Sequence, residues 1–242
     1  MSNDTNDQLV LICGQSATGK SASLRNIRNQ ENWMLLNTEA GKRSPFANKF
    51  QNFRIADPYQ VLEGFEYATT DATSEGIILD SVTFLMDMFE TMYVINSANT
   101  MKGWSDYNQY FKILMQQKVI NYGKPVVITA HTKDVYDEKA LEYKTSVPIK
   151  GALAGVGVES FFSTVVATKR VSVKDLQPFQ NDMLTITEEE EDVGFKYVFQ
   201  TRITKTTTGE RIRAPMGLFD KAHTFIDNCT QQLLDKLKDF YA

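Results

Sequence analysis

A glycine-rich segment near the start of the chain most narrowly limits what it can fold into. Residues 14–21 read G-x-x-x-x-G-K-S and lie between an apolar run, 9–13, and a helix-forming stretch that begins near Lys20. A strand, a glycine loop and a helix in this order form the phosphate-binding loop of nucleoside triphosphate-binding proteins. Gly14 and Gly19 leave room for backbone N–H groups to converge on phosphate oxygens. The sequence therefore predicts an α/β protein that binds a nucleoside triphosphate.

Each position of this loop has an expected task. Lys20 is expected to bridge the β- and γ-phosphates, and the Ser21 hydroxyl is expected to bind Mg²⁺. The helix over 20–29 is expected to add amide N–H groups and a partial positive charge at its N-terminus. The predicted ligands are ATP and Mg²⁺. The residues predicted to bind the nucleotide are Gly14, Gln15, Ser16, Ala17, Thr18, Gly19, Lys20, Ser21 and Ala22.

Length and composition fit one large α/β domain, predicted over 8–242 after a flexible tail, 1–7. The net charge of −4 does not exclude nucleic-acid binding, because a local basic patch would suffice. Cys13 and Cys229 are far apart in the sequence, without metal-ligand spacing, and are expected to be reduced thiols. No signal peptide is recognisable and no apolar run approaches ~20 residues, so a cytoplasmic protein that does not enter the membrane is expected.

Apolar strands alternate with helical stretches over most of the chain. This alternation predicts a mainly parallel sheet with helices on both faces. Strands are expected at about 33–37, 53–56, 76–81, 126–131 and 161–169. Helices are expected at about 58–70, 83–97, 105–121 and 225–241, the last being terminal and amphipathic. A C-terminal antiparallel hairpin is expected from 183–187 and 195–204, with the acidic run 188–192 at its solvated tip. Residues 97–104 are expected to form a loop, and 133–150 a long loop or hairpin.

Three polar residues end strands of the predicted sheet, where α/β proteins bind ligands. Asp80 is expected to bind Mg²⁺ through water. Glu39 is the candidate general base, because the residue after Asp80 is Ser81 and not the glutamate that many such ATPases have there. His131 is expected to contact the γ-phosphate and relay the nucleotide state to the loop behind it. The structural alternatives are a capping aspartate, a surface turn residue and a core histidine.

Basic residues suggest two further sites. One of Arg202, Lys205, Arg211 and Arg213 is expected to act as a finger on the ATP of a neighbouring subunit, with Arg202 and Lys205 the leading candidates. A solvated hairpin is the alternative. Lysines interleaved with aromatic residues in the two loops suit single-stranded DNA, although nearby acids dilute the charge. The candidate DNA-binding residues are Lys102, Trp104, Lys133, Lys139, Lys144 and Lys150.

The order of these motifs resembles that of the RecA-like ATPases, over about residues 8–205. In that family the catalytic glutamate ends the strand after the P-loop helix, as Glu39 does here. The Walker B acid comes next, as Asp80 does. A polar sensor then ends the following strand and leads into a DNA-binding loop, as His131 and 132–150 do. RecA itself has glutamine at the sensor position, and its additional terminal domains have no counterpart in this chain.

Within this group the chain is most similar to the short, phage-encoded Sak4-like proteins. The features that it shares with them are a short N-terminal tail, the strand-ending His131 and the segment 148–151. The resemblance implies a DNA-stimulated ATPase that binds single-stranded DNA and promotes annealing or recombination. It also implies a ring or filament of identical subunits, a single-strand-binding protein as partner, and the cytoplasm of a bacterial host. Two alternatives remain open, a DnaB- or KaiC-like motor or switch and a nucleotide kinase.

Overall fold

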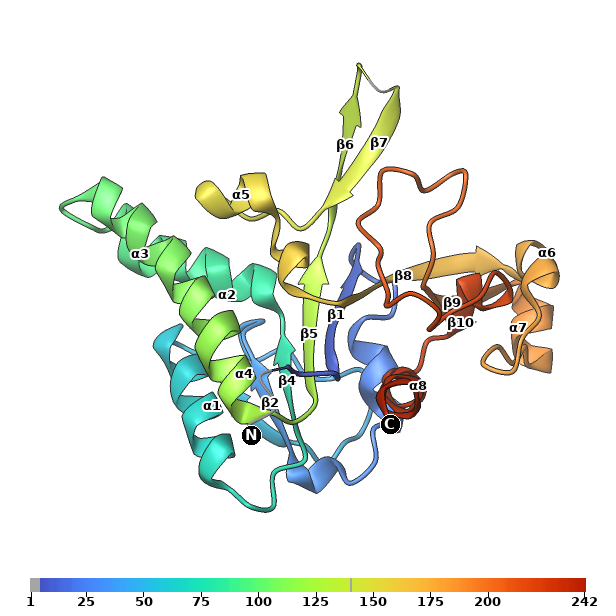
Figure 1. Ribbon diagram of the computed structural model, residues 1–242, viewed down its shortest axis with the longest axis horizontal. Helices are drawn as coiled ribbons and strands as arrows, with labels where there is room; N and C mark the ends of the chain where they lie inside the picture. The colour runs from blue at the N-terminus through green and yellow to red at the C-terminus, as the bar shows by residue number, and fades with distance from the viewer. Residues whose placement is uncertain (1–4, 140) are drawn as a thin grey trace.

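The computed structural model describes residues 5–139 and 141–242. The fold is built around a central eight-stranded sheet (Figure 1). Its strands are β1 (Leu9–Gly14), β2 (Trp33–Asn37), β3 (Gln51–Arg54), β4 (Gly76–Asp80), β5 (Val126–His131), β8 (Thr164–Ser172), β9 (Phe195–Gln200) and β10 (Phe225–Asp227). They lie in the order β10-β9-β8-β1-β5-β4-β2-β3. All neighbours from β8 to β3 are parallel, whereas β9 and β10 add antiparallel pairs. The predicted α/β fold, with a mainly parallel sheet and C-terminal antiparallel strands, is confirmed.

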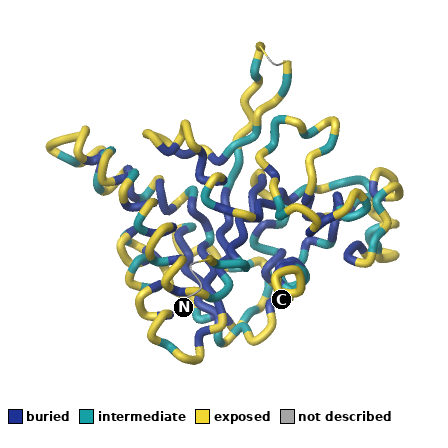
Figure 2. The backbone as a smooth tube through the Cα atoms, viewed as in Figure 1, coloured by how far each residue is buried: buried dark blue, intermediate teal, exposed yellow. Residues whose placement is uncertain are grey.

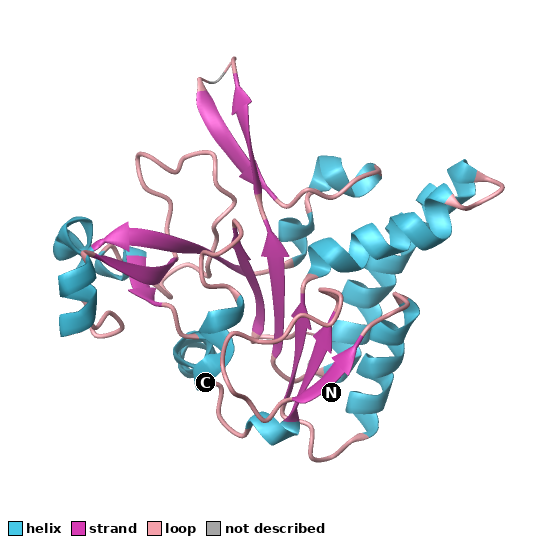
Figure 3. Cartoon of the chain, turned by 180° about the vertical axis from the view of Figure 1, so that it is seen from behind, coloured by secondary structure: helices cyan, strands magenta, loops and turns pink. Residues whose placement is uncertain are grey.

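Helices cover both faces of this sheet (Figures 1 and 3). The α-helices are α1 (Tyr59–Thr70), α2 (Val82–Phe89), α3 (Thr100–Ile113), α4 (Ile120–Tyr122), α5 (Ala152–Val156), α6 (Val173–Leu176), α7 (Glu188–Val193) and α8 (Thr230–Tyr241). Short 3-10 helices are η1 (Ser21–Asn26), η2 (Gln30–Asn32), η5 (Val158–Phe161), η6 (Gln177–Phe179) and η7 (Ala222–Thr224). Two π-helical turns, η3 (Glu90–Ile95) and η4 (Leu114–Val119), continue α2 and α3. No helix in the described part of the chain is long and apolar enough to cross a membrane.

Two apolar cores lie on opposite faces of the sheet, and alternate residues of each strand enter them. In β1, Leu11 packs into the core beneath α1, α2 and α3, whereas Ile12 packs into the core beneath η1 and α8. Side chains alternate along a strand, so a strand covered on both faces is apolar at every position. This is why the strands appear as uninterrupted apolar runs in the sequence and as a buried centre in Figure 2.

The parallel arrangement brings several functional residues to one edge of the sheet. Gly14 at the end of β1 is in register with His131 at the end of β5, and Asn37 at the end of β2 is in register with Asp80. The strand β5 lies between β1 and β4. The same edge of the sheet therefore carries the glycine loop, the end of β2, Asp80 and His131.

The C-terminal region differs most from the sequence-based expectation. Residues 183–187 form no strand, and the acidic run is the helix α7 instead of a hairpin tip. Thr187 and Glu190 form a capping box, and the four acidic side chains of the first turn face the positive end of the helix dipole. The strand β9 pairs with β8 and β10. The terminal helix α8 begins at Thr230, because Phe225–Asp227 belong to β10.

Three further segments depart from their predictions. The expected helix over 20–29 is only the short η1. The expected loop over 97–104 becomes α3 at Thr100, because the Asn99 side chain accepts a hydrogen bond from the Lys102 backbone N–H. Part of the predicted tail, 1–4, lies outside the described residues, whereas Asn6 donates to the Lys124 carbonyl at 2.9 Å. By contrast, the segment 133–150 agrees with the prediction of a long loop or hairpin, because β6 (Lys133–Asp137) and β7 (Glu142–Ser146) form a hairpin there.

Candidate active site

The loop between β1 and η1 is shaped by its two glycines. A Cβ atom at Gly14 would lie 2.0 Å from the Thr168 hydroxyl oxygen, and one at Gly19 would lie 2.6 Å from Nδ2 of Asn228. Gly19 also has a φ of +99°, which side chains rarely permit. The Thr168 hydroxyl and the Asn228 amide therefore pack directly against the loop backbone, and only glycine fits at these two positions. The loop keeps the sequence and the glycine backbone that a phosphate-binding loop needs, so the residues present fit a nucleotide phosphate.

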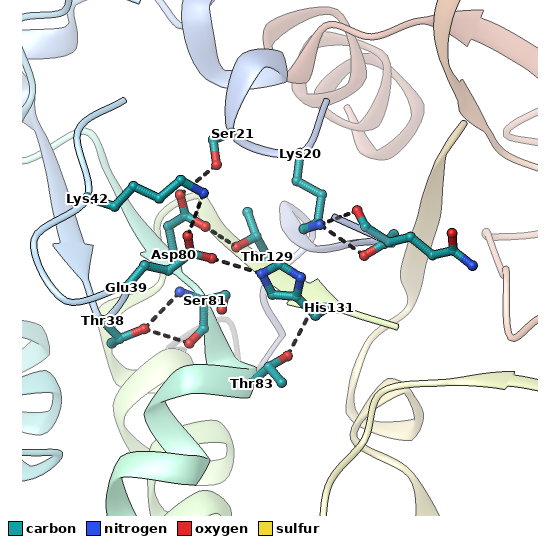
Figure 4. A network of polar contacts seen from close by, with 12 residues as sticks. Lys20, Ser21, Thr38, Glu39, Lys42, Asp80, Ser81, Thr83, Thr129 and His131 are labelled. Carbon is teal, nitrogen blue, oxygen red and sulfur yellow. Dashed lines mark hydrogen bonds and ion pairs between the residues drawn. The ribbon is translucent and has the colours of Figure 1, made fainter. Parts of the chain in front are cut away.

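Lys20 lies inside the curve of this loop. Its ammonium group donates to the carbonyl oxygens of Gly14 at 2.9 Å and Gln15 at 2.7 Å (Figure 4). Only 6% of the residue is exposed, and this burial lowers the pKa of the ammonium group, although Asp80 and Glu39 oppose the effect. The positive charge of Lys20 is thus held where the negative charge of a bound phosphate chain would compensate it.

Asp80 at the end of β4 forms the second part of the site. Its carboxylate accepts hydrogen bonds from the Ser21 hydroxyl at 2.9 Å and from the Thr129 hydroxyl at 2.5 Å. Burial raises the pKa of Asp80, and these two hydrogen bonds partly offset the change. A hydroxyl oxygen beside a carboxylate oxygen is a suitable pair of ligands for Mg²⁺, which takes one or two protein oxygens and completes its shell with phosphate and water.

Glu39, two residues beyond β2, forms the third part. One carboxylate oxygen accepts a hydrogen bond from Nε2 of His131 at 2.9 Å, in the tautomer that carries the proton there, and the other pairs with Nζ of Lys42 at 3.0 Å. Figure 4 shows Glu39, Lys42, Asp80 and His131 converging next to Lys20 and Ser21. The hydrogen bond from His131, assisted by Lys42, lowers the pKa of Glu39 to about 2.

Asp80 and Glu39 are therefore two neighbouring carboxyl groups whose pKa values are moved in opposite directions. Such a divergence is typical of sites in which two carboxyl groups have different tasks. Glu39 is ionised at neutral pH, but a carboxylate with so low a pKa accepts a proton poorly. In this arrangement it can orient a water molecule, and it becomes a stronger base only when His131 or Lys42 moves away.

Lys20, Ser21 and the Glu39 cluster line one cleft of about 880 Å³, and Asp80 lies beside this cleft through its hydrogen bond with Ser21. At one end of it are Lys20, Ser21, Glu39, Lys42 and His131. The other end is formed by Arg25 and Asn26 of η1 together with residues of β9, β10 and α8. The predicted Lys20, Glu39, Asp80 and His131 are thus brought together, since Asp80 contacts Ser21 directly.

Several residues of the site were not predicted from the sequence. Thr129 precedes His131 by two positions on β5, so strand alternation places both on one face, and this signal was available. Thr38 holds the turn after β4, because its hydroxyl donates to the Ser81 carbonyl at 2.7 Å and accepts from the Ser81 N–H at 2.8 Å. Lys42 pairs with Glu39 across a turn whose course no sequence pattern indicates.

The hairpin of β6 and β7 is joined directly to this site. It follows β5 after a single residue and projects from the body of the protein (Figure 1). Gln15 in the glycine loop donates to the Asp134 carboxylate on β6 at 2.6 Å. On β7, the Thr145 N–H donates to the Gly209 carbonyl at 3.0 Å in the loop that follows β9. The hairpin therefore contacts both the phosphate-binding loop and the segment with the candidate finger residues.

The predicted DNA-binding residues do not form one surface. Lys102 and Trp104 lie on α3, far from the hairpin in both views (Figures 1 and 3). The Trp104 ring is half-buried against Tyr107, with centroids 5.3 Å apart, and its contact with a base stays a prediction. The remaining lysines fall into two groups, one exposed and one paired. Lys133 and Lys139 are exposed on the hairpin, whereas Lys144 pairs with Asp137 and Lys150 with Glu90.

The candidate finger residues also differ in their surroundings. Arg202 donates to the Phe219 carbonyl at 2.7 Å, and Arg211 pairs with Glu159 at 3.0 Å. Lys205 is exposed and has no hydrogen bond or ion pair with any described residue. Lys205 is therefore the more available of the two leading candidates.

Comparison with known proteins adds three findings. The sequence matches the family described as AAA domain over residues 6–210. Among solved structures, the crystal structure of the RadB recombinase is similar at a TM-score of 0.41 and 14% sequence identity, over 68% of this chain and 75% of that chain. No match is found among curated proteins.

Proposed function

Because this chain belongs to the AAA domain family, we propose that it is a magnesium-dependent ATPase that binds single-stranded DNA and promotes annealing or recombination. The main support for the ATPase activity is the arrangement of Glu39. Its carboxylate is held by His131 and Lys42 in the cleft that Lys20 and Ser21 also line, with Asp80 beside Ser21. A fixed carboxylate of this kind orients an attacking water molecule in phosphoryl transfer to water.

The metal and the phosphates would be held by residues already in place. Ser21 and Asp80 would supply two oxygen ligands to Mg²⁺, whose charge neutralises phosphate oxygens when it is bound. Lys20 would exchange the carbonyl oxygens of Gly14 and Gln15 for phosphate oxygens.

His131 is proposed to link hydrolysis to the hairpin. In the structure it hydrogen-bonds Glu39 and thereby lowers its pKa. A histidine that turns from Glu39 to a phosphate oxygen would leave Glu39 a better proton acceptor and would displace the residues that follow β5. Since β6 begins two residues after His131, the hairpin is the first element to respond.

The hairpin supports single-stranded DNA binding because it offers aromatic rings and positive charge in one projecting ribbon. Tyr136 and Tyr143 are 49% and 66% exposed, and their ring centroids are 5.2 Å apart. Bases stack on exposed aromatic rings, and the exposed Lys133 and Lys139 add contacts to phosphates. The phage origin, the partner single-strand-binding protein and the bacterial cytoplasm remain proposals based on the resemblance alone.

The enzymatic part is tested by measuring ATP binding and hydrolysis in two variants. Lys20→Ala is expected to lose both binding and hydrolysis. Glu39→Gln is expected to keep ATP binding and to hydrolyse at least about 10²-fold more slowly, because a general base contributes ~10²–10⁴-fold. Unchanged turnover in Glu39→Gln removes Glu39 from this role.

The DNA part is tested by fluorescence anisotropy of a labelled oligonucleotide at low salt. Tyr136→Ala is expected to bind single-stranded DNA about tenfold more weakly, since stacking on one aromatic ring contributes about 1–3 kcal/mol. Lys133→Ala should make the affinity for DNA less dependent on the salt concentration, by the amount expected for the loss of about one phosphate contact. Lys112→Ala, an exposed lysine on α3, is the matched control and should bind as the wild type does. Equal effects in all three variants would contradict a hairpin site.

The assembly part is tested by mixing two inactive variants. Lys205 is proposed to reach the site of a neighbouring subunit in a ring or filament. Lys205→Ala and Lys20→Ala should each be inactive alone, and mixing them should restore part of the activity, because one subunit then supplies the loop and the other the finger. A mixture as inactive as its components would exclude Lys205 as the finger.

A further inference from the structure

The cleft extends well beyond the residues that phosphates require. Its second end is formed by Arg25 and Asn26 of η1 and by Tyr197, Asn228 and Gln232 of the C-terminal segment. None of these five residues belongs to the phosphate-binding loop, the Mg²⁺ pair or the Glu39 cluster. A nucleoside triphosphate held by the loop still has a sugar and a base to accommodate, and this end of the cleft continues from the loop residues Ser16, Ala17 and Gly19.

Unpartnered amide groups are the notable feature of this end. Asn228 is only 3% exposed, yet neither its Nδ2 nor its Oδ1 atom has a hydrogen-bond partner among the described residues. Oε1 of Gln232 is likewise buried and unpartnered within the described chain. Folded proteins satisfy most buried polar groups, because an unpartnered one is destabilising. Both side chains line the cleft, so a bound ligand can supply the missing partners.

The Asn228 amide is held in contact with the phosphate-binding loop. Asn228 follows β10 and precedes Cys229, the N-cap residue of α8. Its carbonyl oxygen accepts a hydrogen bond from Arg25 at 3.3 Å. Its Nδ2 atom lies 2.6 Å from the position that a Cβ at Gly19 would take. A ligand that the loop binds by its phosphates is therefore within reach of this amide.

The chemistry of this end suits a base more than a further phosphate. The nearby Lys196 is neutralised, because it pairs with Glu190 at 2.7 Å and Asp227 at 3.2 Å. Arg25, the other cation at this end, donates to the backbone carbonyl oxygens of Ala22 at 3.0 Å and Asn228 at 3.3 Å. The Tyr197 ring is 39% exposed, and its Cδ1 atom lies 3.5 Å from the Gly19 Cβ position. An aromatic face next to uncharged donors and acceptors is a typical environment for a nucleobase.

We propose that Asn228, supported by Gln232, reads the edge of the adenine base and gives the site its preference for ATP. An asparagine amide offers one donor and one acceptor side by side, and adenine offers the N6 amino donor next to an acceptor nitrogen. Tyr197 supplies the stacking face. This inference rests on the proposed nucleotide binding and adds the residue that determines base specificity.

The test compares three probes by isothermal titration calorimetry on the full chain with magnesium. The probes are ATP, purine riboside triphosphate, which lacks the N6 amino group, and tripolyphosphate, which lacks sugar and base. The wild type should bind ATP about tenfold more tightly than purine riboside triphosphate, as expected for one lost hydrogen bond. Asn228→Leu should remove this difference and leave tripolyphosphate binding unchanged.

The melting temperature of the ligand-free protein separates a binding role from a structural one. Asn228→Leu removes two unpartnered polar atoms, so the melting temperature should stay the same or rise. Gln232→Leu, on the half-buried face of α8, is the second variant and should reduce the preference for ATP in the same direction. A lower melting temperature with equal loss of all three probes, or a preference for ATP that survives in Asn228→Leu, overturns the assignment.

The Lys20→Ala variant distinguishes this inference from the proposed function. If Lys20→Ala loses tripolyphosphate binding while Asn228→Leu keeps the full preference for ATP, the phosphate site stands and only the base assignment is wrong. If the wild type binds none of the three probes, both proposals are wrong.

Discussion

The hydrogen bond between His131 and Glu39 allows a quantitative prediction about stability and pH. The pKa of Glu39 is lowered from 4.5 to about 2, mainly by His131 and next by Lys42. At about 1.4 kcal/mol for each pKa unit, ionised Glu39 stabilises the folded state by about 3 kcal/mol at neutral pH. Since His131 is the largest cause, His131→Leu should remove about 2 kcal/mol of that stabilisation.

The sign of the pH dependence follows from the direction of the change. The folded pKa lies below that of the unfolded chain, so the stabilisation is complete above about pH 5 and is lost as the pH falls towards 2. Glu39→Gln should therefore cost about 3 kcal/mol of unfolding free energy at pH 7 and less than half of that at pH 3. The assay is urea denaturation of both single variants and the double variant at each pH.

If the effects of the two substitutions on the free energy of unfolding simply add, this reasoning is refuted. If His131 acts on stability through Glu39, the double variant at pH 7 should be about 2 kcal/mol more stable than the sum of the single effects predicts. A coupling below about 0.5 kcal/mol, or a cost of Glu39→Gln that is the same at pH 7 and pH 3, would show that the carboxylate is not held as described.

Three further predictions concern other parts of the chain. Thr187→Ala removes the capping box of α7 and should lower the free energy of unfolding by about 1 kcal/mol, measured with urea; no change would place the helix start elsewhere. Gly14→Ala places a Cβ 2.0 Å from a threonine hydroxyl oxygen and should weaken ATP binding by at least about tenfold in calorimetry, whereas unchanged affinity would mean that the loop tolerates a side chain. His223 lies 2.8 Å from both Asp182 and Asp220 and lowers the pKa of each, so the melting temperature should fall less steeply between pH 5 and pH 3 in His223→Asn than in the wild type.

The fold was largely predictable because its main signals are local. Apolar runs mark the parallel strands, and the glycine loop identifies β1 and its neighbours. The C-terminal region was not predictable from pattern alone. The acidic run 188–192 looked like a solvated turn, but the capping box of Thr187 and Glu190 starts a helix there. The strand β10 has only three residues, too few to show a period.

The site was predictable where it follows strand ends and unpredictable where it depends on packing. Asp80 and His131 end parallel strands, and Glu39 lies just beyond one, so sheet topology brings them together. The tie between Glu39 and Lys42 depends on how the chain turns after β2, and the unpartnered Asn228 amide depends on contact between segments over 200 residues apart. Such contacts arise from tertiary packing, which a single sequence does not encode in any short pattern.

We propose that one site hydrolyses ATP and communicates with a DNA-binding hairpin through His131. The most direct measurement is the steady-state rate of ATP hydrolysis with and without single-stranded DNA, for the wild type and His131→Ala. We expect that single-stranded DNA increases the wild-type rate and that His131→Ala hydrolyses ATP without responding to DNA. A wild-type rate that single-stranded DNA leaves unchanged at low salt, with no DNA binding under the same conditions, would contradict it.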